Sequence, residues 1–321
     1  MPSVWSRVGK RAQGLARRTP STIRVLGRRL SRSQRAERRL VHSHLKAPSV
    51  PRSPSRRIEG SVWAISMVRN EENTIAHTVQ HLARQGIDAF LIADNGSTDG
   101  TADVLRSLAK EHCVHVLTDS LQDYLQGTKM TILAELARRQ GADWIVPFDA
   151  DELWFAGEGT VADFLRSSAC PIVEATLHNV FPSRDDDLQE SNPFRRLRSL
   201  DSYPSSLGKV AFRTHRFMRI ATGNHGVSRP GCSSAGLYIA HFPWQSFDQL
   251  RSKLENGKLA LQSIADEELG AHWRRGGSLD SNGMEALWNA LCDGQPVETL
   301  AWSPVGPMVQ ARVDEWTSFM L

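Results

Sequence analysis

Between residues 61 and 157, apolar segments are separated by polar turns at regular intervals. Four mostly apolar runs have the length of buried strands, namely 62–68, 89–93, 114–117 and 144–148. Three further stretches carry apolar residues at helical spacing, namely 75–86, 102–108 and 130–139. Strands that alternate with helices predict an α/β fold with a mostly parallel central sheet flanked by helices.

Polar clusters follow three of these apolar runs. Asn70, Asp94 and Asp149 lie at or just beyond the ends of three predicted strands. In doubly wound sheets, ligands bind beyond the carboxyl ends of the strands. The clusters therefore predict one binding site at a single edge of the sheet.

The segment Asp149-Ala150-Asp151-Glu152 carries the strongest chemical signal. Two carboxylates at positions i and i+2, directly after an apolar strand, can converge on one divalent cation. Mg²⁺ and Mn²⁺ prefer oxygen ligands and leave coordination positions for substrate phosphates. A solvated turn is the alternative, but the preceding strand favours a metal site.

The loop 94–101, Asp-Asn-Gly-Ser-Thr-Asp-Gly-Thr, carries the second signal. Its small residues let the backbone pass close to a ligand. Asp94 can accept hydrogen bonds from a nucleobase or a ribose, whereas Asp99 is expected to cap the following helix. Taken alone, the loop is equally compatible with a simple turn.

The pattern becomes mixed after residue 157. Strands are expected at 176–180 and 208–212, a charged loop at 184–198 and a helix at 247–268. We therefore expect a single domain over 58–321, with a regular α/β half at 58–157 and a mixed half at 158–321.

Charge separates the first 57 residues from the rest. They carry 16 Lys and Arg against one acid, Glu37, whereas the remainder carries 23 basic and 34 acidic residues. We expect residues 1–57 to be a disordered tail, since they lack the apolar surface needed to offset ordering entropy. Apolar residues at helical spacing within it leave open a basic helix on an anionic membrane. The Arg- and Ser-rich composition also resembles a transit peptide.

Cysteines and hydropathy indicate the compartment. The four cysteines are widely spaced and form no Cys-x-x-Cys pair, namely Cys113, Cys170, Cys232 and Cys292. We therefore expect no disulfide and a reducing compartment. No apolar run approaches the roughly 20 residues of a membrane helix. The expected location is the bacterial cytoplasm, with peripheral membrane contact through the tail as an option.

Three motifs, in this order and spacing, resemble one known family. They are Met67-Val68-Arg69-Asn70-Glu71-Glu72, the loop 94–101 and Asp149-Ala150-Asp151-Glu152. Together they closely resemble the nucleotide-binding half of family 2 glycosyltransferases, which implies a GT-A fold. The likeness covers residues 61–155 and continues more loosely through 208–209, 224–226 and 241–243.

The resemblance implies a nucleoside-diphosphate sugar as the donor, with Mn²⁺ or Mg²⁺ as the metal. It also implies that residues 58–157 are the nucleotide-sugar-binding half of the domain and residues 158–321 the acceptor-side half. The residues implied to bind the donor are Asn70, Glu71, Asp94, Asn95, Asp149, Lys209 and His225. The implied metal ligands are Asp149, Asp151 and His241. A core position is the alternative for His241, and a plain surface charge is the alternative for Lys209.

The predicted reaction moves a sugar, with UDP as the expected carrier, to an acceptor hydroxyl, and the family likeness implies inversion. Such a reaction needs a carboxylate base. Glu152 and Asp187 are the candidates, although the acidic run 185–187 also suits a solvated loop. A glycan, a lipid-linked molecule or a small molecule is the expected acceptor, and no nucleic-acid partner is expected.

Two other functions remain open from sequence. A nucleotidyltransferase of related fold would also place acids after a strand, but it usually carries a Gly-rich basic loop after the first strand. A non-catalytic transferase-like domain with a nucleic-acid-binding tail is the second alternative, and the intact acids argue against it. The sequence contains neither a GxxxxGK[ST] loop nor a GxGxxG after the first strand, which argues against a kinase and a dinucleotide dehydrogenase.

Overall fold

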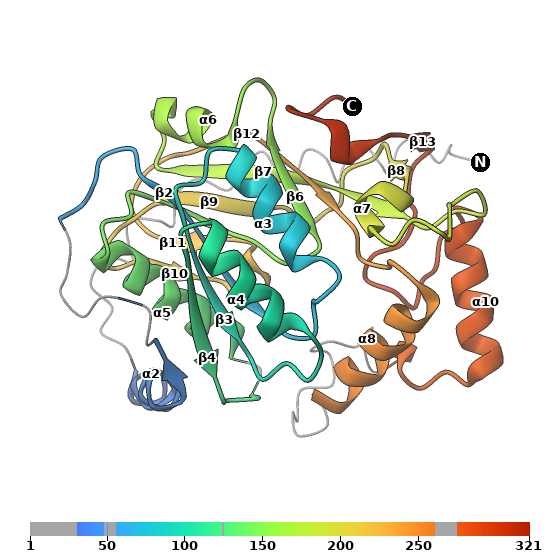
Figure 1. Ribbon diagram of the computed structural model, residues 1–321, viewed down its shortest axis with the longest axis horizontal. Coiled ribbons are helices and arrows are strands. Elements are labelled where there is room, and N and C mark those ends of the chain that lie inside the picture. Colours follow the sequence, from blue (N-terminus) through green and yellow to red (C-terminus); the bar gives the residue numbers. More distant parts are fainter. Residues whose placement is uncertain (1–30, 48–49, 51–55, 124, 261–274) are drawn as a thin grey trace, which may run out of the picture.

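The computed structural model describes residues 31–47, 50, 56–123, 125–260 and 275–321. They form an α/β fold in which helices cover both faces of a large central sheet (Figure 1), as predicted. Within these residues, no helix is both long enough and apolar enough to cross a membrane.

The strands of the first half are β1 (Leu45–Lys46), β2 (Val62–Val68), β3 (Ala89–Asp94), β4 (Val114–Asp119), β5 (Trp144–Pro147) and β6 (Glu152–Ala156). Those of the second half are β7 (Ile172–Phe181), β8 (Ser199–Asp201), β9 (Lys209–Arg213), β10 (Arg219–Ile220), β11 (Val227–Ser228), β12 (Ser233–His241) and β13 (Met308–Gln310).

The central sheet runs in the order β1-β4-β3-β2-β5-β9-β7-β12-β6. Strands β2, β3, β4 and β5 pair in parallel, as do β7 and β12. Strand β9 is antiparallel to both of its neighbours, and β6 is antiparallel to β12. Strands β4, β3, β2, β5, β7 and β12 therefore all point the same way, and their carboxyl ends share one edge.

The helices are α2 (Arg32–His44), α3 (Ile75–Arg84), α4 (Thr101–Glu111), α5 (Gln126–Arg139), α6 (Val161–Ser167), α7 (Pro193–Arg196), α8 (Phe247–Ala260) and α10 (Ser281–Cys292), with the 3₁₀ turns η2 (Thr222–Asn224) and η3 (Val313–Glu315). Helices α3, α4 and α6 pack in one apolar cluster on one face of the sheet. Helix α5 packs in a second cluster on the other face. The amphipathic spacing on α3 explains its position, because Ile75, Val79 and Leu82 are all fully buried.

Residues 31–47 differ from the predicted disordered tail. Helix α2 lies on the body (Figure 1), where Val41 is fully buried in a cluster with Leu121 and Ile132. An ion pair joins Arg38 to Glu135 of α5 at 2.6 Å. Composition suggested disorder because the segment itself has few apolar residues. It could not show that another part of the chain supplies the apolar surface on which this basic helix packs. Residues 1–30 lie outside the described residues.

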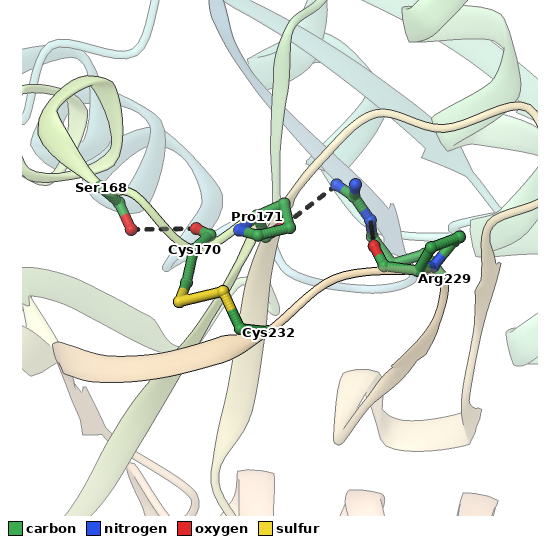
Figure 2. The surroundings of a disulfide bond; sticks show 6 residues. Ser168, Cys170, Pro171, Arg229 and Cys232 are labelled. Atoms are coloured by element: carbon green, nitrogen blue, oxygen red, sulfur yellow. Dashed lines mark hydrogen bonds between the residues drawn. A yellow bond between two sulfur atoms is a disulfide. The ribbon is translucent and has the colours of Figure 1, made fainter. Parts of the chain in front are cut away.

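Cys170 and Cys232 form a disulfide, contrary to the expectation from sequence. Each cysteine lies just before one of two paired parallel strands, β7 and β12, where Ile172 is in register with Ser233. The Cα atoms are 5.2 Å apart, a normal separation for a bridge. Figure 2 shows the bond linking the segments that lead into the two strands. Because the two cysteines lie 62 residues apart in the sequence, their proximity could not be predicted from it.

Candidate functional site

The loops after β2 and β3 interlock at the carboxyl edge of the sheet. The Asn70 backbone N–H donates to Ser97 Oγ at 3.0 Å, and the Thr98 N–H donates to Asn70 Oδ1 at 2.8 Å. Glu71 N–H donates to Thr101 Oγ1 at 2.8 Å. Asn70 has a positive φ of 57°, which Asn tolerates better than most side chains. The first two sequence motifs therefore form one structural unit.

Asp94 and Asp99 have different partners within this unit. Asp94 Oδ1 accepts a hydrogen bond from the Ser97 N–H at 2.9 Å, and the residue is partly exposed. Asp99 Oδ1 accepts from both the N–H and the hydroxyl of Thr101 at the start of α4. Asp99 thus stabilises the helix start, which is the structural role expected from sequence.

Asn95 points away from this unit and joins the loops after β3 and β4. Its amide nitrogen donates to Asp119 Oδ2 at 2.8 Å and to the Leu121 carbonyl at 2.7 Å. Lys129 pairs with the same Asp119 oxygen at 2.7 Å. The side chain of Asn95 is therefore engaged in an internal network, whereas the sequence suggested a ligand contact.

Asp149 and Glu152 share one buried cation, Lys209. Its Nζ lies 2.5 Å from Asp149 Oδ2 and 2.5 Å from Glu152 Oε1. Glu152 Oε2 also accepts hydrogen bonds from the Asp149 backbone N–H and from Trp154 Nε1. Burial raises the pKa of Glu152 to about 8, with Asp149 and Asp151 adding to the effect against the opposing charge of Lys209. Glu152 therefore holds buried groups together. Its buried side chain is poorly placed for a base that must reach an acceptor.

Asp151 has a cation partner of its own, Lys253 of α8. Lys253 Nζ lies 2.7 Å from Asp151 Oδ2. Burial acts to raise the pKa of Asp151, but Lys253 and His241 outweigh it and lower the pKa to about 2. Asp151 is therefore ionised at neutral pH. Burial raises the pKa of the neighbouring Glu71 to about 7, where the charge of Lys253 acts to lower the pKa and that of Asp151 to raise it.

His241, at the end of β12, faces Asp151 with a lone pair. Its Nδ1 lies 2.8 Å from Asn179 Oδ1, an atom that can only accept, so Nδ1 carries the proton in the neutral ring. Burial lowers the pKa of His241 to about 4 and keeps the ring neutral. Nε2 then presents its lone pair to Asp151 Oδ2, 3.7 Å away.

This pair can supply two ligands to a divalent cation. A neutral imidazole held by a second partner through its other nitrogen is a common metal ligand. Asp149, the third predicted ligand, is bonded to Lys209 instead. Across the residues that the structure describes, no three His, Cys, Asp or Glu side chains converge as a metal site. The residues thus fit a cation that takes the rest of its ligands from substrate and water.

Asn224 joins this cluster and was missed as a site residue from sequence. It is fully buried, has a positive φ of 60°, and its amide nitrogen lies 3.4 Å from Asp149 Oδ1. Its side-chain oxygen is buried and has no hydrogen-bond partner among the residues that the structure describes. Asn224 and Asn70 are the two non-glycine residues with positive φ in the described chain, and both border the acids. The available signals were the looser family resemblance through 224–226 and the glycine on either side of Asn224-His225.

The remaining predicted residues lie at the periphery. His225 is exposed, and its Nδ1 lies 2.8 Å from the Gly208 carbonyl. Asp187 lies in the exposed loop after β7, at the same edge of the sheet, and accepts a hydrogen bond from the Gln189 N–H. Lys253 was not predicted, because a lysine within a helix has no local pattern that distinguishes it from a surface charge.

Interlocked loops and paired acids at the carboxyl edge of a largely parallel sheet define a ligand-binding α/β enzyme domain. Residues 64–205, somewhat less than half of the chain, match the model of glycosyl transferase family 2. A comparison with curated proteins finds no match.

Solved structures give distant similarities. Residues 1–349 of TarS from S. aureus share 11% identity over 68% of this chain and 70% of that chain, with a TM-score of 0.38. The same protein in complex with UDP-GlcNAc gives 10% identity, coverage of 68% and 71%, and a TM-score of 0.39. A glucose-1-phosphate thymidylyltransferase from Bacillus anthracis gives 10% identity, coverage of 71% and 83%, and a TM-score of 0.29. At these TM-scores, none of them adds to the argument for function.

Proposed function

We propose that this protein transfers a sugar from a nucleoside-diphosphate sugar, with UDP as the nucleotide, to an acceptor hydroxyl with inversion at the anomeric carbon. The observation that carries the proposal is the junction of the two interlocked loops with the Asp149–Asp151 cluster at one edge of the sheet. That edge offers a carboxylate for a nucleoside and, beside it, a charged cluster for a diphosphate.

Roles follow from the partners of each residue. Asp94 is partly exposed next to Asn70 and Glu71, which suits recognition of the base or ribose. Lys209 and Asn224 hold Asp149 through its two carboxylate oxygens, so we assign Asp149 to the ribose or to a metal-bound water. His225 is exposed and is assigned to contact with the sugar or the acceptor.

Mn²⁺ or Mg²⁺ would be held by Asp151 and His241. When bound, such a cation stabilises the negative charge that develops on the departing nucleoside diphosphate. Asp151 is ionised and His241 neutral at pH 7, which are the protonation states that metal ligands require.

Asp187 is our proposal for the catalytic base, since Glu152 is buried and both of its oxygens have partners. A base must take the proton from the acceptor hydroxyl as that oxygen attacks the anomeric carbon. An acceptor at a membrane surface would suit contact of the basic N-terminal segment with anionic lipid.

Thermal stability in the presence of UDP tests the proposal. We expect UDP with Mn²⁺ to raise the Tm of the wild type, and the increase to shrink in Asp151→Ala. A positive result justifies a screen of UDP-sugars with a coupled assay for UDP release. If UDP, GDP and the other nucleoside diphosphates leave the Tm unchanged with and without metal, the proposed function is wrong.

A further inference from the structure

Lys253 brings a positive charge into the acidic cluster from a distant part of the chain. It lies on α8, and its Nζ is 2.7 Å from Asp151 Oδ2 and 3.4 Å from the Pro243 carbonyl. The side chain is 26% exposed, so it is neither sealed in the core nor free in solvent. It lies at the same carboxylate oxygen that faces His241.

The packing of α8 does not require this lysine. Leu250 and Leu254, on the same helix, are fully buried in a cluster with Trp244 and Leu287. Apolar residues of this kind anchor a helix without the desolvation cost of a buried ion pair, which often exceeds its Coulombic gain. A lysine at this position is therefore better explained by a ligand than by the stability of the fold.

The charges of the cluster divide into two sets. Lys209 is matched by Asp149 and Glu152. Among the residues that the structure describes, Lys253 forms a direct ion pair with Asp151 alone, and its bonds to Asp151 and Pro243 use two of its three ammonium protons. An anion that approaches Asp151 and His241 therefore meets the positive charge of Lys253.

We propose that Lys253 binds the diphosphate of the nucleotide donor directly, so that donor binding includes a component that needs no divalent cation. This inference rests on the proposed function and assigns a donor-binding residue within it. The ammonium group supplies a fixed positive charge beside the Asp151–His241 pair. A hydrogen bond to a charged group changes affinity by roughly 10- to 100-fold, which sets the size of the effect.

Calorimetric titration of UDP in EDTA tests the proposal with four proteins: the wild type, Lys253→Gln, Lys253→Arg and Arg251→Gln. Arg251 lies on the same helix, is exposed and pairs only locally with Asp248, so its variant removes the same charge without touching the cluster. We expect the wild type and Arg251→Gln to bind UDP in EDTA, and Lys253→Gln to bind about 10- to 100-fold more weakly. Lys253→Arg should retain most of the affinity.

Uridine, which lacks phosphates, separates a charge effect from damage to the fold. We expect uridine to bind the wild type and Lys253→Gln equally, with matching circular dichroism spectra. The proposal is wrong if Lys253→Gln binds UDP like the wild type, if it loses uridine and UDP in the same proportion, or if the wild type binds UDP only with Mn²⁺. Failure of any nucleoside diphosphate to bind with or without metal would instead overturn the proposed function itself.

Discussion

Lys209 Nζ lies 2.5 Å from Asp149 Oδ2. The lysine begins β9, 60 residues after the aspartate, and its side chain is 4% exposed. Because the same ammonium group also meets the buried Glu152, it joins the acidic motif to the antiparallel half of the sheet. Lys209 therefore contributes both to the candidate site and to the fold.

Replacing this shared cation should destabilise the protein. In Lys209→Met, Glu152 and Asp149 lose their partner, and breaking a buried pair costs about 3–5 kcal/mol of unfolding free energy. Urea denaturation at pH 7 measures the change, with the exposed Lys46→Met as the control. Lys209→Met/Glu152→Gln should recover part of the loss, because it also removes a buried acid. A loss below 1 kcal/mol in the single variant would contradict this role.

Acid should weaken the fold through His81. Its Nε2–H donates to the Trp154 carbonyl, and burial lowers its pKa from 6.5 to about 4. The unfolded chain then binds a proton that the folded chain does not, so stability falls as the pH drops from 6.5 toward 4. The effect is about 3 kcal/mol across this window.

Comparison of variants isolates this contribution. His81→Gln keeps an N–H donor without the titration, so its unfolding free energy should fall less between pH 6.5 and 4.5 than that of the wild type. His112→Gln, at a partly exposed position after α4, should follow the wild type. Parallel pH profiles for wild type and His81→Gln would contradict the assignment.

The two acids of the 94–101 loop are expected to have different roles, Asp94 in nucleotide binding and Asp99 in stability. Asp94→Asn should lower UDP affinity about tenfold, because it removes a charged acceptor, with little change in stability. Asp99→Asn weakens the start of α4 and should lower the unfolding free energy by about 1 kcal/mol with a smaller effect on affinity. Calorimetry and urea denaturation of both variants check this, and equal losses of affinity would show that the loop acts only as a unit.

The Cys170–Cys232 bond should stabilise the protein without touching the site. Its loop of 62 residues predicts up to about 4 kcal/mol from chain entropy. Cys170→Ser/Cys232→Ser should therefore unfold at lower urea concentration, with unchanged UDP affinity, because the bond lies before the amino ends of β7 and β12. Thiol titration of the denatured, unreduced protein should find two free thiols, from Cys113 and Cys292, and four would show that the bond is not formed.

The parallel half of the sheet could be predicted because its information is local. Each of β2, β3 and β5 is a continuous apolar run followed by a polar turn, and the periodicity of α3 is clear. Strand β6 could not be recognised in the same way. It begins within the acidic motif at Glu152, and its partner β12 lies some 80 residues further along the chain.

The same contrast holds for the site. Asp94, Asp149 and Asp151 come from motifs that follow strands, so their location at one edge of the sheet could be predicted from the rule for carboxyl ends. Lys253 and Asn224 enter from a helix and a short turn, and only the tertiary structure brings them to the acids. Asn95 shows the converse case, since a residue inside a predicted functional motif also uses its amide nitrogen to hold two loops together, which its sequence position does not indicate.

The short pairing of β1 with β4 has a practical consequence. Leu45 and Lys46 cover the backbone of Thr118 and Asp119 at the outer strand of the sheet, while α2 covers Ile132. An unprotected outer strand is a template for self-association. Trimming the basic segment back to residue 57 to improve solubility would therefore do the opposite, whereas trimming to residue 30 would leave this protection in place.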